Sequence, residues 1–427
     1  MKIEEIYQCF LQSTGVCTDT RKITSDCLFV ALKGDNFDAN EFAQQALNQG
    51  AAFAIIDNKK FLTDEDKMIL VPDSLTALQE LAHHHRNELG LPIIALTGSN
   101  GKTTTKELIN TVLSKKYNTK ATVGNLNNHI GVPLTLLSFD EDTDLGIVEM
   151  GANHQKEIEL LCKIAEPDYG YITNFGKAHL EGFGSTEGVI KGKSELYEYL
   201  EKNHKTAFVN LDDKIQKEKT ENLSRFTFSV TTDGDIQINS VSANPMVKIG
   251  FKNEEIDSHL IGIYNANNIN AAITIGTYFN VDTADIKDAI QNYTPTNNRS
   301  QLTEKNGNQI ILDAYNANPS SMAAAIQNFI QLDGTNKIAV LGDMFELGKE
   351  SLDEHKKVVE SLVNEPQIET HFVGKDFYSN KTENPHLHFY ESFESFSVAF
   401  QNSKPTEKLI LIKGSRGMAL ERTLDLI

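Results

Sequence analysis

Short apolar runs alternate with helical stretches along most of this chain. Each run has the length of a strand and lacks a regular polar alternation, which is typical of strands buried on both faces. The segments between many of the runs are long enough for helices that cross from one parallel strand to the next. We therefore predict an α/β fold with mostly parallel sheets. The runs lie at 27–32, 51–56, 92–96, 145–148, 168–172, 309–312, 337–341 and 408–412.

Turn-forming residues interrupt this pattern near 88–92 and near 293–298. A chain of 427 residues exceeds what one hydrophobic core usually serves, so several domains are expected. We place three domains at 1–88, 89–296 and 297–427. The first is a small α/β unit, the central one has a mostly parallel sheet, and the third repeats this pattern as a second nucleotide-binding-like sheet.

A glycine-containing loop, Thr-Gly-Ser-Asn-Gly-Lys-Thr-Thr, occupies 97–104 between an apolar run and a helical pattern. This order directs backbone N–H groups and the positive end of a helix dipole at an anion. Lys102 would add a point charge, and Thr103 would hold a magnesium ion. Leu96 stands where the general phosphate-loop pattern has its first glycine, and a plain strand-to-helix turn is the alternative. The predicted phosphate contacts also include Gly98, Ser99, Asn100, Gly101 and Thr104.

Three side chains beyond this loop are candidates for the same site. Glu149 ends an apolar run, where phosphoryl-transfer proteins commonly place a carboxylate for magnesium, although a solvated strand-end acid is the alternative. A lone histidine is more often a surface or core residue than a metal ligand, so His179 is a candidate ligand only if a metal site lies next to it. Lys193 is either functional or an exposed residue near a helix start. The histidines at 83–85 are expected at the surface, because successive helical residues do not converge on one metal.

The charge balance limits the classes of partner. The chain has 40 Lys and Arg against 59 Asp and Glu, a net charge of −19, and no long basic block. Nucleic acid is therefore not an expected partner, and a phosphate site must come from local cations and backbone amides. Four cysteines without a C-x-x-C pair favour reduced thiols. The sequence shows no apolar leader and no membrane-spanning run, so we expect a cytoplasmic protein.

In their order along the chain, these motifs resemble those of the Mur ligase family, the ATP-dependent amide-bond ligases of peptidoglycan precursor synthesis. The resemblance covers essentially the whole chain, and Leu96 is expected for the shorter Mur-type loop T-G-x-x-G-K-T. Three segments are most similar to the branch that adds D-alanyl-D-alanine to UDP-N-acetylmuramoyl-tripeptide, namely 18–34, 312–322 and 341–348. The family motifs themselves are 97–104, 149–152, 174–179, 193 and 265–268.

The resemblance implies a role for each domain. The first would bind the uridine diphosphate end of the sugar nucleotide, the central one would be a phosphate-loop ATPase, and the third would be Rossmann-like. For the sugar nucleotide it implies Thr20, Arg21 and Gly34, with Asn125, Asn127 and Asn128 approaching from the central domain. For ATP it implies Asn265, Asn268, Arg299, Asp313 and Tyr315. His129 stands where relatives often have glutamate, and its role stays open.

The resemblance also implies catalytic roles for Lys102, His179 and Lys193, with two magnesium ions. His179 would bind the second ion. Lys193 would be carbamylated, which turns a cation that repels metal into an anion that can position metal or substrate. Remaining substrate contacts are assigned to Asn316, Asn318, Lys413, Ser415 and Arg416, although the last three can equally form a helix-start turn.

The family chemistry implies that the tripeptide carboxylate attacks the ATP γ-phosphate and that the dipeptide amine then attacks the acyl phosphate. Since three substrates must meet, we expect the third domain to close over the central sheet. A monomer is expected. The alternatives are another Mur-type ligase, a folylpolyglutamate synthetase-like ligase, or a non-catalytic nucleotide-binding switch. The third peptide residue, diaminopimelate or lysine, is left open.

Overall fold

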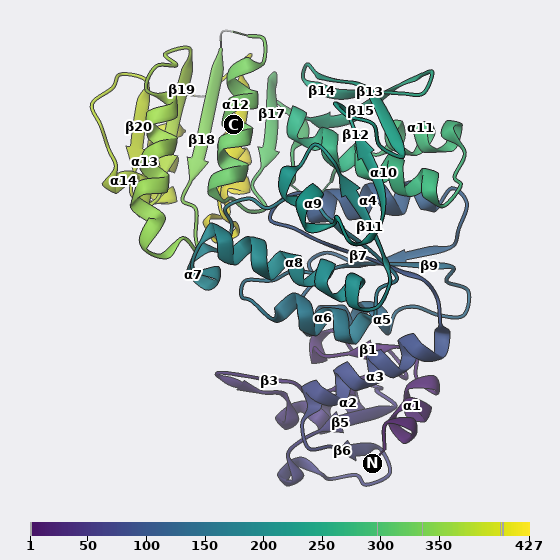
Figure 1. The fold of residues 1–427 in the computed structure, drawn as a ribbon. Coiled ribbons are helices and arrows are strands. Elements are labelled where there is room, and N and C mark those ends of the chain that lie inside the picture. The colour runs from purple at the N-terminus through teal and green to yellow at the C-terminus, as the bar shows by residue number, and fades with distance from the viewer. Residues whose placement is uncertain (1, 297, 335, 402, 404) are drawn as a thin grey trace.

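Three sheets with their helices follow one another along the chain. The structure, a computed structural model, describes residues 2–296, 298–334, 336–401, 403 and 405–427. The sheets lie in chain order from the N-terminal unit at the bottom of the view to the C-terminal unit at the upper left (Figure 1). Most strand pairs are parallel, so the predicted α/β class is confirmed. Among the described residues, every helix is too short or too polar to span a membrane.

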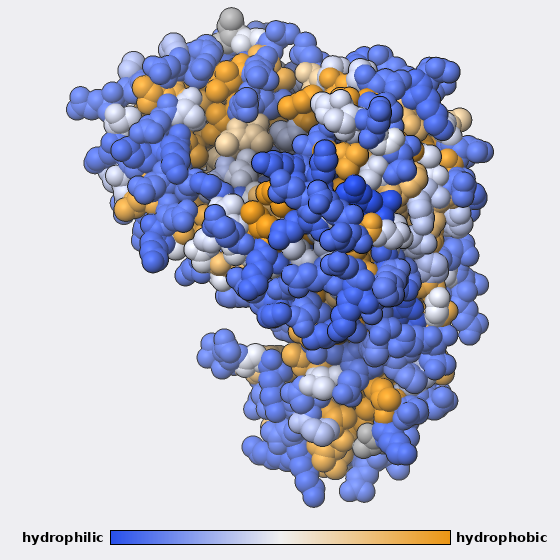
Figure 2. Space-filling model, in the orientation of Figure 1, coloured by the Kyte–Doolittle hydropathy of each residue, from blue (hydrophilic) through white to orange (hydrophobic). Residues whose placement is uncertain are grey.

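The N-terminal unit has a four-stranded parallel sheet in the order β1-β2-β5-β6. Strand β2 is buried throughout, as its unbroken apolar sequence predicts. A separate hairpin of β3 and β4 projects from this unit, and Figure 2 shows an open recess between the hairpin and the body above it. The elements are α1 Ile3–Leu11, β1 Val16–Cys17, β2 Leu28–Val30, β3 Lys33–Gly34, β4 Phe37–Asp38, α2 Ala43–Asn48, β5 Phe53–Ile56, β6 Met68–Leu70 and α3 Ser74–Leu89.

Helix α3 connects this unit to the central sheet, because it packs against α1 and also against the central helices α5 (Gly131–Leu136) and α6 (Glu157–Ala165). Asp73 caps its first turn, and Gly90 ends it at φ 61°. Arg86, which is 8% exposed, donates to the carbonyls of Ala165 and Glu166 at 3.0 and 2.9 Å. Its guanidinium also lies 3.0 Å from the carboxylate of Asp168. One buried side chain therefore ties the two units together.

Replacing this arginine should loosen that junction. In Arg86→Ala, two carbonyls and a carboxylate lose their charged donor, so we expect the free energy of unfolding to fall by about 2–3 kcal/mol. Circular dichroism in urea measures this, since the chain has no tryptophan for fluorescence. Arg225→Ala, whose bonds are long at 3.4 Å, is the matched control. Equal stability of the two variants would contradict the prediction.

The central sheet has nine strands in the order β15-β14-β13-β12-β11-β10-β7-β9-β8. Pairing is parallel from β8 to β13, and the last three strands form an antiparallel meander. The elements are β7 Ile93–Thr97, α4 Lys102–Leu113, β8 Thr119–Ala121, α5 Gly131–Leu136, β9 Leu145–Glu149, α6 Glu157–Ala165, β10 Tyr169–Ile172, α7 Leu180–Phe183, α8 Thr186–Lys202, β11 Thr206–Asn210, α9 Lys214–Lys219, β12 Ser224–Ser229, β13 Ile236–Ala243, β14 Met246–Phe251, β15 Glu254–Ile261, α10 Ala266–Tyr278 and α11 Thr283–Asn292.

The position of β7 determines where a ligand can bind. From β7 the chain runs to β8 and β9 on one side and then to β10 on the other, so the strand order reverses at β7. In open α/β sheets, ligands bind outside the carboxyl ends of the strands at such a reversal. The glycine loop after β7 lies at this point.

The C-terminal unit has six strands in the order β16-β17-β21-β18-β19-β20. All pairs are parallel except the β16–β17 hairpin. Its elements are β16 Gln301–Lys305, β17 Asn308–Asp313, α12 Pro319–Gln331, β18 Lys337–Gly342, α13 Ser351–Leu362, β19 Ile368–Val373, α14 Lys375–Ser379, β20 Leu387–Tyr390, α15 Phe393–Phe400 and β21 Leu409–Lys413. Short 3-10 turns complete the chain at η1 Thr20–Lys22, η2 Ala39–Phe42, η3 Lys59–Phe61, η4 Ile263–Asn265, η5 Gly348–Glu350, η6 Arg416–Met418 and η7 Leu420–Leu426.

The prediction that His85 lies at the surface is wrong. The side chain is only 4% exposed, because α3 packs it against α1. Its ring is hydrogen-bonded to Tyr7 Oη at 3.2 Å and to the Phe139 carbonyl at 3.0 Å.

The predicted domain limits stay predictions. The limit at 88 falls in the last turn of α3. The limit at 297 falls on Asn297, which lies outside the described residues.

Candidate active site

A cavity of about 1050 Å³ lies between the phosphate loop of the central sheet and the third domain. Most of the residues predicted from the sequence meet there, whereas Gly98, Lys193, Thr20, Arg21 and Gly34 do not line it. The predicted residues that line it are Ser99, Asn100, Gly101, Lys102, Thr103, Thr104, Asn125, Asn127, Asn128, Glu149, His179, Asn265, Asn268, Arg299, Asp313, Tyr315, Asn316, Asn318, Lys413, Ser415 and Arg416.

Both glycines of the loop are required by close contacts and by a positive φ. Gly98 has φ 143°, and an added Cβ would lie 2.0 Å from Oγ1 of Thr173. Gly101 has φ 79°, and its Cβ would lie 2.6 Å from Oδ1 of Asn268. L-residues with a side chain rarely adopt this conformation, and here the space is filled as well. The loop therefore approaches β10 and α10 more closely than any other residue type permits.

Some backbone N–H groups of the loop are hydrogen-bonded within the protein, and others remain available to a ligand in the cavity. Ser99 and Asn100 donate their backbone N–H groups to the carbonyl and side-chain oxygens of Asn174, both at 3.1 Å. Gly101 begins α4 without a side-chain cap. Since the first N–H groups of a helix have no intrahelical partner, those of α4 are available at the cavity, where the helix dipole favours an anion. We expect phosphate to bind mainly at Gly101 to Thr104.

Lys102 points back onto its own loop. Its Nζ donates to the Gly98 carbonyl at 2.8 Å. Burial lowers the pKa of Lys102 below its usual value, while the charge of Glu149 opposes that shift. A partly buried ammonium held only by carbonyl oxygens would be stabilised by an incoming phosphate.

Glu149 presents a carboxylate oxygen that the protein leaves unbonded. The side chain is 1% exposed, and Oε1 accepts from Nδ2 of Asn127 at 2.8 Å. Oε2 is buried and has no hydrogen-bond partner. A buried carboxylate oxygen without a donor is costly unless a cation binds there. Thr103, 5% exposed in the first turn of α4, lies in the same cavity.

These oxygen ligands fit magnesium in the way that nucleotide sites hold it. The described residues contain no group of three or more His, Cys, Asp and Glu side chains placed to hold a metal by themselves. Magnesium is commonly bound through one or two carboxylates together with substrate phosphates and water. Glu149 and Thr103 could therefore supply the protein's oxygen ligands for one such ion.

Lys193 is buried in the middle of α8, so its interpretation as an exposed residue at a helix start is wrong. It is 1% exposed, and its Nζ donates to the Ala152 carbonyl at 2.9 Å and lies 5.1 Å from the centre of the Phe183 ring. No ion pair of the described residues includes it. Burial lowers the pKa of Lys193 well below its usual value, and the charge of Lys102 acts in the same direction.

The third domain contacts the central domain at the edge of the cavity. Nδ2 of Asn318 donates to Oδ1 of Asn100 at 2.7 Å, which joins the start of α12 to the phosphate loop. Lys177 donates its backbone N–H to Oγ of Ser320 at 2.7 Å, and its Nζ lies 2.9 Å from Glu354. The third domain thus already lies against the central sheet, whereas its movement on ligand binding stays a prediction.

The predicted adenine residues form a buried amide chain beneath the loop. Nδ2 of Asn268 donates to Oδ1 of Asn265 at 2.8 Å, and Asn265 in turn donates to the Ile261 carbonyl at 2.8 Å. Across the cavity, the guanidinium of Arg299 lies 3.7 Å from the centre of the Tyr315 ring. Asn265, Asn268, Arg299 and Tyr315 therefore bring polar and planar groups to one cavity, as recognition of a nucleoside requires.

The residues assigned to substrate binding differ in how accessible their side chains are to a substrate. Lys413 is 1% exposed and forms an ion pair with Asp313 at 2.6 Å. Ser415 accepts the N–H of Phe345 at 2.9 Å. Arg416 is exposed beside Glu421, and Arg21 of the first domain is exposed with its guanidinium on Asp19. The two arginines are thus the charged groups of this set that a substrate can reach.

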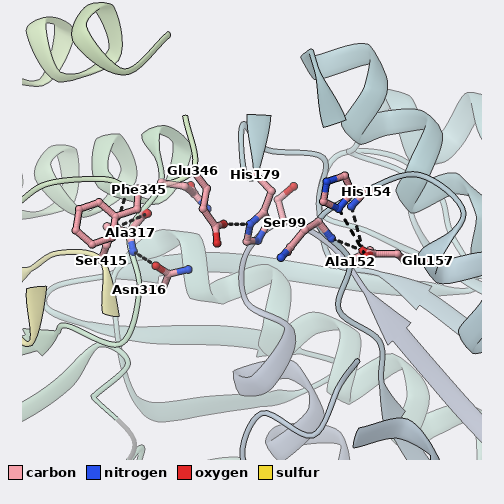
Figure 3. A network of polar contacts seen from close by, with 12 residues as sticks. Ser99, Ala152, His154, Glu157, His179, Asn316, Ala317, Phe345, Glu346 and Ser415 are labelled. Atoms are coloured by element: carbon pink, nitrogen blue, oxygen red, sulfur yellow. Dashed lines mark hydrogen bonds and ion pairs between the residues drawn. The ribbon is translucent and has the colours of Figure 1, made fainter. Parts of the chain in front are cut away.

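Sequence reasoning gave no chemical role to several residues that line the cavity, among them Glu157, Asp213 and Glu346. Glu157 accepts the backbone N–H of Asn153 at 2.6 Å. It also accepts the backbone N–H of His154 at 3.0 Å (Figure 3). Glu346 belongs to the segment 341–348, which served only to identify the branch of the family. The available signal was that Glu346 lies in the loop that follows the apolar run 337–341, because the loops at the carboxyl ends of parallel strands face the site.

Comparisons with known proteins agree with this arrangement. Sequence models for the Mur ligase family, catalytic domain, the Mur ligase middle domain and the Mur ligase, glutamate ligase domain match residues 12–86, 96–276 and 298–416. The UDP-N-acetylmuramoyl-tripeptide–D-alanyl-D-alanine ligase of Bacillus subtilis (strain 168) is 37% identical over 97% of this chain and 93% of its own length.

Solved structures are similar over the full length as well. A crystal structure of MurF from Acinetobacter baumannii has a TM-score of 0.87 at 30% identity, covering 100% of this chain and 98% of that one. MurF ligase from Thermotoga maritima in complex with ADP has a TM-score of 0.85 at 26% identity, covering 98% and 97%. With all three family domains matched in order, the chain belongs to the Mur ligase family.

Proposed function

We propose that this protein is the ATP-dependent ligase that joins D-alanyl-D-alanine to UDP-N-acetylmuramoyl-tripeptide, forming the pentapeptide precursor of peptidoglycan with release of ADP and phosphate. The observation that carries the reaction type is the cavity that joins the phosphate loop, the unbonded oxygen of Glu149 and the third domain. The identity of the substrates is supported by the full-length relatives that bear this name. We expect the enzyme to act in the cytoplasm as a monomer.

ATP binds in this cavity with its phosphates at the start of α4. The free N–H groups of the first turn hold the phosphate oxygens, and Lys102 leaves the Gly98 carbonyl to contact them. Asn265 and Asn268 lie on the base side, and Arg299 and Tyr315 approach from beyond the central sheet. The phosphates are thereby aimed toward the third domain, which supplies the opposite wall.

Magnesium, when bound, screens the negative charge of the phosphates and of the attacking carboxylate. Glu149 and Thr103 would hold one ion, and His179 would hold a second. Lys193 would act beside them as its carbamate, formed from carbon dioxide and the neutral amine. Its burial without an anionic partner favours the neutral amine, which is the form that reacts.

The reaction proceeds by two attacks in one enclosed site. An oxygen of the tripeptide's terminal carboxylate attacks the γ-phosphorus, and the bond from that phosphorus to the bridging oxygen breaks with departure of ADP. The dipeptide's amine then attacks the acyl carbon, loses a proton, and expels phosphate. The chain's own contribution is to align the reactants and to supply positive charge from Lys102 and the α4 terminus.

The sugar nucleotide reaches the cavity from the first domain. Thr20, Arg21 and Gly34 would hold its uridine diphosphate end, and Asn125, Asn127 and Asn128 line the cavity nearer the phosphate loop. The match of the first domain to a Mur family model at 12–86 disfavours the folylpolyglutamate synthetase-like alternative, which has no uridine-binding domain to account for these residues. Asn316, Asn318, Lys413, Ser415 and Arg416 lie on the opposite wall, where the dipeptide would bind.

A reconstituted assay tests this function. The purified protein receives ATP, magnesium, D-alanyl-D-alanine and UDP-linked tripeptide with either lysine or diaminopimelate at its third position. We expect phosphate release that depends on the dipeptide. We also expect a product whose mass equals the sum of the UDP-linked tripeptide and the dipeptide minus one water. Omission of the dipeptide is the control, and glutamate with a folate acceptor tests the alternative enzyme. ATP turnover without any dipeptide-dependent product would refute the proposal.

A further inference from the structure

Glu346 of the third domain faces His179 of the central domain across the cavity edge (Figure 3). The carboxylate of Glu346 is hydrogen-bonded to Nδ1 of His179. Its backbone carbonyl also accepts the N–H of Glu181 at 3.1 Å. One residue of the third domain thus holds the His179 segment by both side chain and main chain.

The partner of Nδ1 determines what the other ring nitrogen can do. A carboxylate accepts hydrogen bonds, so Nδ1 carries the proton in this pair, and Nε2 of the neutral ring keeps its lone pair. No hydrogen bond of the described residues uses Nε2 of His179, while the side chain lines the cavity and is 21% exposed. Nε2 is therefore the nitrogen available to a ligand.

The loop that carries Glu346 is fixed by the third domain. The backbone N–H of Met344 donates to Nε2 of the fully buried His355 at 3.0 Å, and that of Phe345 donates to Oγ of Ser415 at 2.9 Å. Glu346 and His179 both have left-handed backbones, with φ 61° and 51°. Such conformations persist where surrounding contacts hold them. The carboxylate therefore occupies a position set by the third-domain fold.

We propose that Glu346 is a positioning residue that orients His179 for metal binding and makes the metal site depend on docking of the third domain. A carboxylate on the distal nitrogen of a metal-binding histidine fixes its tautomer and its ring orientation. Here that carboxylate comes from another domain. The inference rests on the proposed function, which assigns His179 to a metal ion.

Manganese binding tests the inference without turnover. Electron paramagnetic resonance reports manganese, a probe for magnesium, bound to the protein with ADP and without the other substrates. In Glu346→Gln we expect the affinity of the His179 site to fall by about 10–100-fold, the usual effect of losing such a partner. In Glu350→Gln, an exposed acid of the neighbouring turn η5, we expect the wild-type affinity.

A double-mutant cycle separates positioning from docking alone. In a His179→Ala background, Glu346→Gln should have no further effect, because its action passes through the ring. An equal loss of affinity in Glu354→Gln, which breaks the neighbouring contact with Lys177, would mean that docking alone matters and would overturn the role of Glu346. Unchanged affinity in Glu346→Gln with weakened affinity in His179→Ala would also overturn it. Unchanged affinity in His179→Ala would remove the proposed metal role itself.

Discussion

Replacing Lys193 with alanine is expected to lower turnover by at least about 100-fold, the size of effect seen when one preorganised electrostatic group leaves an active site. The Nζ atom is buried, bonded to the Ala152 carbonyl, and included in no ion pair of the described residues. A lysine needed only for stability would be expected to find a carboxylate. The proposed carbamate would replace this poorly solvated cation with an anion, which would account for a lysine buried without a carboxylate partner.

Three measurements check this prediction. Phosphate release gives the loss of turnover, and carbon-13 NMR after incubation with labelled bicarbonate should show a carbamate signal in wild type that Lys193→Ala lacks. Acetate or another small carboxylate should restore part of the activity. Lys191→Ala is the matched control, since Lys191 is exposed on the same helix two residues earlier. Full activity of Lys193→Ala would refute the catalytic role.

Lys102→Ala should reduce kcat/KM for ATP by about 10³-fold, since phosphoryl transfer depends on charge stabilisation and positioning. In this structure Lys102 is held by the Gly98 carbonyl and not by a carboxylate, so little energy is lost when it moves to a phosphate. Its partly buried site also strengthens each charge interaction relative to water. The variant loses the only side-chain cation that the loop 97–104 itself provides.

Calorimetry with ADP and phosphate-release kinetics separate binding from chemistry. We expect the main loss in kcat, because the charge on the transferred phosphate group is redistributed in the transition state. Lys115→Ala serves as control, because Lys115 lies just beyond the far end of α4 and forms an exposed ion pair with Asp288 at 2.5 Å. A Lys102→Ala enzyme whose kcat/KM stays within a few fold of Lys115→Ala would contradict the prediction.

Local pattern sufficed to predict most of the elements near the site. The apolar runs at 92–96, 145–148 and 168–172 became β7, β9 and β10, because unbroken apolar segments of that length are stable only when both faces are covered. The glycine loop was readable for a similarly local reason, since strand, turn and helix adjoin in sequence. The His85 side chain was misplaced, because its neighbours, α1 and the Phe139 carbonyl, come from distant parts of the chain.

The sequence by itself determined the fold class, the phosphate loop and, through motifs spread along the chain, the family. Each of these depends on residue types at fixed local spacings. Only the tertiary structure decided that Lys193 is buried, that one oxygen of Glu149 lacks a donor, and that Glu346 contacts His179. These facts depend on packing between elements far apart in the chain, and burial and hydrogen-bond partners are properties of that packing.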